Sequence, residues 1–224
     1  MKDKNVEKMI GYGCKNLSED EPWRIFHIMS EFVYGFEAMS NIGPAVSIFG
    51  SARVSPSSPH YQVAEKTGKL FAKAGFSVIT GGGPGIMEAV NKGASEAGGK
   101  SIGLNIIIPY EQKTNRFVNM ELKFRYFFCR KVMFLRYANG FLFLPGGYGT
   151  MDELFESLTL IQNQRETAFP VIMLGRKYWK GMLGWLKDEV LSKGYISEKD
   201  LGMMKIVDEP AEAVALIKKS RMKK

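Results

Sequence analysis

The amino-acid sequence predicts an α/β protein with a Rossmann-like, doubly wound parallel sheet, helices on both faces and an N-terminal helical extension. Short, continuously apolar segments alternate with segments of helical periodicity, which is typical of a parallel sheet covered on both faces. Two of the apolar segments run directly into glycine-rich turns, as at the ligand-binding edge of such sheets. The chain has 224 residues, of which 45% are hydrophobic and 24% charged, enough to bury a core without disulfides.

The first 43 residues are predicted to form an extension. Residues 1–20 are polar and unpatterned, whereas apolar side chains recur near helical spacing over residues 21–40. The sequence Asn41-Ile42-Gly43-Pro44 then ends the helix. We expect this helix to cover a sheet edge or a partner subunit.

The catalytic or binding domain is expected over residues 44–217. Its predicted strands are 45–49, 76–80, 101–108, 141–144, 170–174 and a short one near 205–207. Its predicted helices are 61–74, 86–97, 125–138, 150–163, 179–192 and 210–218, with a longer polar connection over 109–119. Residues 218–224 are expected to form a basic tail.

The composition excludes several classes of protein. No apolar run is long enough for a membrane span, and the N-terminus lacks the apolar stretch of a secretory signal. Cys14 and Cys129 are too few for a disulfide framework, so we expect a reducing, cytoplasmic location. The formal net charge is +8, but five basic residues lie in the last seven positions, which leaves +3 for the rest. Nucleic-acid binding is therefore a weak interpretation.

The first glycine turn, GGGPGIM at residues 81–87, follows the second predicted strand. Such turns let the backbone approach a phosphate, and the next helix presents unpaired N–H groups. The sequence fits neither the dinucleotide fingerprint nor a Walker sequence. A tight turn and an anion site are about equally favoured by this motif alone.

The second turn, PGGYGTMDE at residues 145–153, combines glycines with Thr150, Asp152 and Glu153. Acidic residues at a helix N-terminus can simply favour the helix dipole. A carboxylate beside an anion site can also stabilise developing positive charge, as in the oxocarbenium-like transition state of glycosidic cleavage. Arg130 and Lys131 precede the fourth predicted strand, in a helix that by itself is most simply an ordinary amphipathic one.

These motifs together resemble the LOG ("lonely guy") family, long labelled "possible lysine decarboxylase". GGGPGIM, Arg130-Lys131-x-Met133 and PGGYGTMDE occur in the family's order, and the similarity runs over about residues 45–192. It includes GSARV at 50–54 and LFESLTLIQ at 154–162. The resemblance implies a nucleoside 5′-monophosphate phosphoribohydrolase that releases a free base and ribose 5-phosphate.

The same resemblance implies the site residues. The expected catalytic pair is Arg130 and Glu153. The substrate-binding residues that the resemblance implies are Glu111, Lys131, Gly147, Tyr148, Gly149, Thr150, Met151, Asp152 and Thr159. As a hypothesis of our own, Gly82 and Gly83 help to bind the phosphate, and Arg130 holds Glu153 ionised through a bidentate contact. No metal or organic cofactor is implied, and neither glycine motif holds a lysine placed for a pyridoxal phosphate decarboxylase. The family also forms dimers, so a homodimer or larger homo-oligomer is expected.

Features of the bacterial branch, ARVSPSSP and EQKTNRFVN, make AMP at least as good a substrate candidate as a cytokinin precursor. A carrier or sensor that binds a nucleotide or phosphorylated cofactor without turnover is the alternative. A basic-tailed DNA-processing protein is a third interpretation. The sequence does not identify the general acid for the leaving base.

Overall fold

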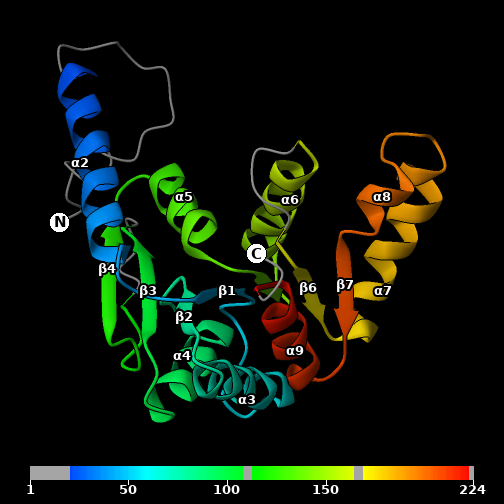
Figure 1. Cartoon of the computed structure of the whole chain (residues 1–224), viewed down its shortest axis with the longest axis horizontal. Coiled ribbons are helices and arrows are strands. Elements are labelled where there is room, and N and C mark those ends of the chain that lie inside the picture. The colour runs from blue at the N-terminus through cyan, green and yellow to red at the C-terminus, as the bar shows by residue number, and fades with distance from the viewer. Residues whose placement is uncertain (1–20, 108–112, 164–168, 222–224) are drawn as a thin grey trace, which may run out of the picture.

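The computed structural model is built on one seven-stranded sheet in the order β4-β3-β2-β1-β5-β6-β7, and all six strand pairs are parallel (Figure 1). It describes residues 21–107, 113–163 and 169–221. The strands are β1 (Ala45–Phe49), β2 (Ser77–Thr80), β3 (Ser101–Ile106), β4 (Met120–Phe124), β5 (Phe141–Phe143), β6 (Val171–Leu174) and β7 (Met204–Val207). The chain builds β1 to β4 in one direction and then β5 to β7 in the other. The order therefore reverses between β1 and β5, where open α/β sheets bind ligands.

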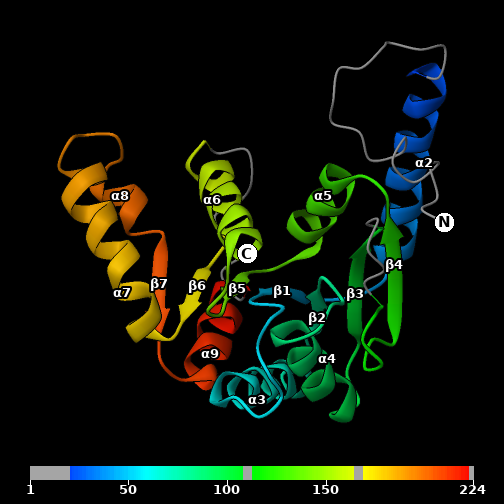
Figure 2. The same cartoon turned by 180° about the vertical axis from the view of Figure 1, so that it is seen from behind.

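Helices cover both faces of the sheet, so the predicted fold class is confirmed (Figures 1 and 2). On one face lie α3 (Pro59–Lys73), α4 (Ile86–Glu96) and α9 (Pro210–Arg221). On the other lie α2 (Glu21–Met39), α5 (Phe127–Tyr137), α6 (Tyr148–Gln162) and α7 (Arg176–Trp185), with the short α8 (Glu198–Leu201). No described helix is both long and apolar enough to cross a membrane.

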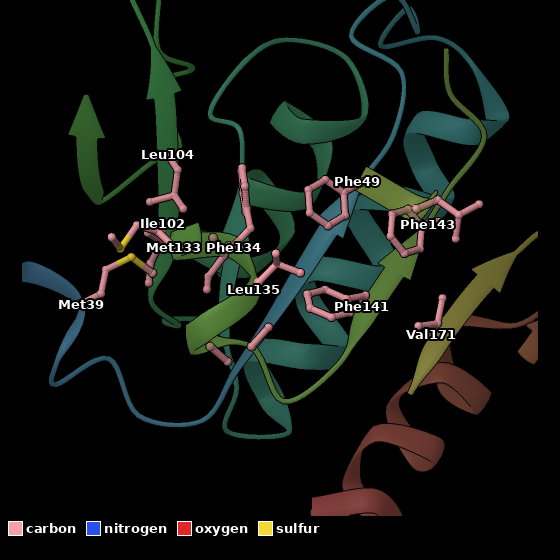
Figure 3. Packing of buried hydrophobic residues seen from close by; sticks show 14 of the residues in the cluster. Met39, Phe49, Ile102, Leu104, Met133, Phe134, Leu135, Phe141, Phe143 and Val171 are labelled. Carbon is pink, nitrogen blue, oxygen red and sulfur yellow. The ribbon is translucent and has the colours of Figure 1, made fainter. Parts of the chain in front are cut away.

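Alternating side chains of the central strands separate two buried clusters. On β5, Phe141 and Phe143 join the cluster under α5 and α6, while Leu142 and Leu144 join the one under α3 and α9. Figure 3 shows the first cluster, where Phe49 of β1 lies beside Phe143. Their rings stack at 5.1 Å between centroids. Full burial on both faces explains why these strands are continuously apolar in sequence.

The structure differs from the predicted elements in several places. β4 was not predicted, because its sequence MELKF alternates polar and apolar side chains as an edge strand does. β3 ends at Ile106, two residues early. The helix predicted over 179–192 begins at Arg176, and its second half, Leu186–Leu191, is π-helical. Helix α9 continues to Arg221, so three of the five C-terminal basic residues belong to its last turn rather than to an extended tail.

Candidate functional site

Three glycine-containing turns meet at the carboxyl edge of the sheet, and Ser51 ties them together. Its N–H donates to the carbonyl of Pro145 at 3.0 Å, and its carbonyl accepts from the N–H of Ile86 at 2.9 Å. The turn after β1 is thereby hydrogen-bonded both to the turn after β5 and to the start of α4. Gly146 permits this close approach, because a Cβ there would lie 3.0 Å from the Ser51 nitrogen and closer still to the Thr150 hydroxyl.

These turns surround a cavity of about 730 Å³ at the point where the strand order reverses. This volume is in the range of small-molecule sites. Its lining comes from β1 and the turn after it, the first residue of the GGGPG turn, α4, α5 and the PGGYGT loop. The lining residues are Ile48, Phe49, Gly50, Ser51, Ala52, Arg53, Gly81, Met87, Arg130, Phe134, Gly146, Gly147, Tyr148, Gly149, Thr150, Met151 and Glu153.

Arg130 reaches the cavity from α5 and is held between aromatic rings. Its guanidinium carbon lies 5.0 Å from the ring centroid of Phe127 and 5.7 Å from that of Phe134. Burial lowers the pKa of this guanidinium, against the attraction of Glu153 and Asp152. Its Nε is buried without a hydrogen-bond partner. A charged donor held this way is available to an anionic or polar ligand.

Glu153 lies in the second turn of α6, and its side chain is almost fully buried at 4% exposure. Its Oε2 has no hydrogen-bond partner. Burial, helped by the nearby Glu156 and Asp152, raises the pKa of this carboxyl to about 7, against the opposing effect of Lys131 and Arg130. A buried carboxyl that titrates near neutrality in a cavity is typical of a functional acid or base.

The N-terminus of α6 forms part of the cavity lining. The cap position is Gly147, which offers no side-chain hydrogen bond to the first turn, and Tyr148 and Gly149 are exposed. The first N–H groups of a helix have no partner within the helix. Together with the positive end of the helix dipole they favour an anion. Among the described residues, no group of three or more His, Cys, Asp and Glu side chains could hold a metal ion.

Gly82 and Gly83 do not line the cavity, although the sequence placed them at the ligand. They are buried behind the turn, where both carbonyls accept from the side-chain amide of Asn115 at 3.1 and 3.0 Å. That amide also donates to the buried Asn91 of α4. Gly82 has a φ of +70°, and a Cβ there would collide with Asn105. These glycines therefore shape the turn and connect it to the loop before β4, while Gly81 faces the cavity.

Lys131, Asp152 and Thr159 also lie outside the lining. Lys131 bridges Asp152 at 2.8 Å and Glu156 at 2.6 Å, so it joins α5 to α6. Burial lowers the pKa of Lys131, but hydrogen bonds to Asp152 and Glu156 outweigh it, and the pKa is raised overall. The Thr159 hydroxyl is exposed and donates to the carbonyl of Phe155. Glu111 lies outside the described residues.

The expected bidentate contact between Arg130 and Glu153 is absent from the described ion pairs and hydrogen bonds. The guanidinium instead lies over Phe127 and Phe134, and the neighbouring Lys131 pairs with the carboxylates of Asp152 and Glu156 on α6. Arg130 and Glu153 both line the cavity but keep separate buried polar atoms without partners. A ligand between them could therefore meet both groups.

The sequence-based assignment missed the contribution of the turn after β1. Ser51 and the exposed Arg53 line the cavity, and the N–H of Arg53 donates to the Ser51 hydroxyl at 3.1 Å. The sequence GSARV directly follows a buried strand, at the same sheet edge as both glycine motifs. That position was the available signal.

The fold and this crevice define a Rossmann-like protein with a small-molecule site at the switch point of its sheet. The chain belongs to the family described as "Possible lysine decarboxylase", the LOG family, whose model matches residues 87–217. Its sequence is 26% identical over 159 residues to a cytokinin riboside 5′-monophosphate phosphoribohydrolase of Mycobacterium tuberculosis, covering 68% of this chain and 82% of that protein. It is 29% identical over 172 residues to a pyrimidine/purine nucleotide 5′-monophosphate nucleosidase of Escherichia coli, covering 71% of this chain but 37% of that protein.

Solved structures of other proteins have a similar fold. The molybdenum cofactor carrier protein of Chlamydomonas reinhardtii superposes with a TM-score of 0.60 at 22% identity, over 80% of this chain and 98% of that chain. A molybdenum cofactor binding protein of Rippkaea orientalis gives a TM-score of 0.57 at 23% identity, over 79% and 96% of the two chains. At these identities the likeness concerns the fold.

Proposed function

We propose that this protein hydrolyses the N-glycosidic bond of purine nucleoside 5′-monophosphates, with AMP as the first candidate substrate. The observation that carries the proposal is the buried Glu153 carboxyl, whose Oε2 has no partner and which shares one cavity with the partnerless Nε of Arg130. The distant relatives named as phosphoribohydrolase and nucleosidase support the same class of reaction.

The 5′-phosphate is assigned to the N-terminus of α6. The N–H groups of the Gly147–Thr150 turn and the helix dipole favour a dianion there. Arg53 lines the same cavity and adds a cation that can meet the same phosphate. This assignment places the ribose deeper in the cavity, over Glu153.

The reaction breaks the bond between C1′ of the ribose and the base nitrogen, whose electron pair leaves with the base. Positive charge then develops at C1′ and the ring oxygen, and the Glu153 carboxylate stabilises it. Water adds its oxygen to C1′ and gives up a proton, while the leaving base takes one up. The products are free base and ribose 5-phosphate. Arg130 positions the ribose phosphate; no residue is assigned as the acid for the base.

The test is incubation of the purified protein with AMP and, separately, with isopentenyladenosine monophosphate, following free base and ribose 5-phosphate by chromatography. We expect release from at least one nucleotide, and none from adenosine, which lacks the phosphate anchor. The ratio of the two rates ranks adenine against a cytokinin-type base. Tight nucleotide binding without release would contradict the proposal and favour a carrier, the role named for the Chlamydomonas reinhardtii structural neighbour.

The kcat/KM for base release is expected to rise with pH and level off above about pH 7, because kcat/KM reports the ionisation of the free enzyme. The Glu153 pKa is raised to about 7, and the proposed role needs the carboxylate, so kcat/KM falls roughly tenfold per unit below that value. The measurement is kcat/KM from pH 5 to 8.5. A rate that instead falls as the pH rises through 7 would mean that Glu153 acts as an acid.

A further inference from the structure

Helix α6 carries carboxylates at residues 152, 153 and 156, and one cation of α5 pairs with two of them. Asp152 and Glu156 lie four residues apart, on the same side of the helix, where like charges repel each other. The Lys131 Nζ lies 2.8 Å from an oxygen of Asp152 and 2.6 Å from one of Glu156. Among the described residues these are the only ion pairs that join α5 to α6, which lie on the same face of the sheet (Figures 1 and 2). Lys131 therefore offsets the repulsion and links the two helices.

Glu153 stands between these two carboxylates in the sequence, but it lines the cavity. Burial has the largest effect on its pKa and raises it, and Lys131 has the next largest effect and lowers it. Smaller effects follow from Glu156, which raises this pKa, from Arg130, which lowers it, and from Asp152, which raises it. Lys131 thus opposes the effect of burial more strongly than Arg130 does, although only Arg130 shares the cavity with Glu153.

Lys131 acts on Glu153 from outside the cavity lining. The charged residues of that lining are Arg53, Arg130 and Glu153, and Lys131 is not among them. Only 16% of the Lys131 side chain is exposed, so solvent screens its charge weakly. A ligand in the cavity therefore meets the two arginines, while Lys131 stays paired with the carboxylates of α6.

We propose that Lys131 is a positioning residue for the hydrolysis: paired with Asp152 and Glu156, it keeps Glu153 as a carboxylate at neutral pH. This inference rests on the proposed function, which needs the charged form of Glu153. Without Lys131, the buried Glu153 would lie beside two uncompensated negative charges. Burial and like charges both favour the protonated acid, which cannot stabilise positive charge at C1′.

A direct contact between Lys131 and the nucleotide, as the family resemblance implies, predicts a different result. Removal of such a contact would weaken the use of AMP by the same factor at every pH. Removal of a charge that holds Glu153 ionised instead moves the pH at which the enzyme becomes active. The pH profile therefore separates the two roles.

The test is kcat/KM for AMP from pH 5 to 9 in Lys131→Met, relative to the wild type. Methionine keeps the length of the side chain and removes its charge. We expect the profile to move up by about one pH unit, so that the variant is about tenfold less active at pH 6 but within about twofold of the wild type at pH 9. The ratio of the two proteins cancels the ionisation of the substrate phosphate. The same loss at every pH would overturn the proposal.

Two further variants show whether charge is the cause. Lys131→Arg keeps the cation and is expected to restore the wild-type profile. Lys193→Met breaks the exposed pair with Glu189 and is the matched control, with an unchanged profile. A profile of Lys131→Arg that matches Lys131→Met would assign the effect to shape and overturn the proposal.

A measurement without turnover separates this proposal from the proposed function. The titration of Glu153 can be followed by NMR of protein labelled with ¹³C at its glutamate carboxyls, with Glu153→Gln identifying the signal. We expect a midpoint near 7 in the wild type and about one pH unit higher in Lys131→Met. If the wild type releases no base but the midpoint still moves, the proposed function fails and the control of Glu153 by Lys131 stands. An unchanged midpoint overturns the proposal whatever the activity.

Glu156→Gln keeps the proposal testable if Lys131→Met does not fold, because methionine leaves the buried Oε2 of Glu156 without its cation. This variant removes one of the two like charges and keeps Lys131. The titration midpoint of Glu153 is therefore expected to fall below that of the wild type, and base release to extend to lower pH. A midpoint that stays or rises would mean that the charges around Lys131 do not set the ionisation of Glu153.

Discussion

Glu153→Gln is expected to lower the rate of base release by about a thousandfold or more, while nucleotide binding changes by less than a few-fold. Glutamine keeps the shape of the side chain but removes the negative charge that opposes the developing positive charge at C1′. Loss of one preorganised electrostatic group in a buried site typically costs 10²–10³ in kcat, and a full charge stands at the upper end. The measurement is kcat from product release, together with the Kd for AMP by calorimetry.

The same variant is expected to be more stable than the wild type at pH 8 and equally stable at pH 4. The pKa of Glu153 is raised from 4.5 to about 7, so on raising the pH the unfolded chain releases this proton first. The stability linked to the group is complete below about pH 4.5 and is lost as the pH rises through about 7. The difference at pH 8 is on the order of 3 kcal/mol. Urea unfolding at the two pH values measures it.

Glu189→Gln is the matched control for both measurements, because Glu189 is exposed and pairs with Lys193 far from the cavity. It should change neither kcat nor the pH dependence of unfolding. A Glu153→Gln protein that is more stable at pH 8 but still active would support the burial of the wild-type carboxyl and contradict its catalytic role. A protein that loses nucleotide binding along with activity would assign Glu153 to binding instead.

The sheet could be predicted from the sequence because its central strands are buried on both faces. Segments such as AVSIF, SVIT and PVIML are continuously apolar and end in glycine turns, so both their existence and their common edge follow from the sequence. β4 could not be found this way, because an edge strand with one exposed face looks like polar loop. The order of strands, and with it the switch point, depends on packing that no single segment encodes.

The structure brings part of the predicted site together at the cavity, and the residues that lie outside the cavity follow a physical pattern. Residues whose backbone must lie at the cavity, Gly147 to Met151, are marked by their glycines and line it. Gly82 and Gly83 are also glycines after a strand, but they shape the turn and do not line the cavity. Their carbonyls accept hydrogen bonds from the Asn115 side-chain amide, which lies 32 residues or more along the chain. Arg130 and Lys131 are neighbours on α5, but Arg130 lines the cavity and Lys131 pairs with α6. The helical pattern of the sequence does not show which of the two side chains faces the cavity.

Gly93→Ala is expected to destabilise the protein by about 3 kcal/mol, the upper end for overpacking in a close-packed interior. Gly93 lies on α4, and a Cβ there would stand 1.9 Å from the Glu65 carbonyl oxygen and 2.9 Å from the Lys69 nitrogen of α3. Gly68 of α3 makes the reciprocal approach, since a Cβ there would stand 2.0 Å from the Val90 carbonyl oxygen. Backbone atoms cannot rotate away as a flexible side chain can, so the two helices must separate.

The separation should also reach the site, because α4 begins at Ile86, whose N–H is bonded to Ser51 in the cavity wall. We therefore expect a several-fold rise in the KM for AMP together with the loss of stability, measured by urea unfolding and steady-state kinetics. Gly181→Ala is the matched control: nothing lies within 4 Å of its Cβ position on α7, and alanine there should stabilise by up to ~1 kcal/mol. Equal stabilities for the two variants would mean that α3 and α4 can move apart at no cost in free energy. The contact between these helices would then not fix the position of the turn that contains Gly81.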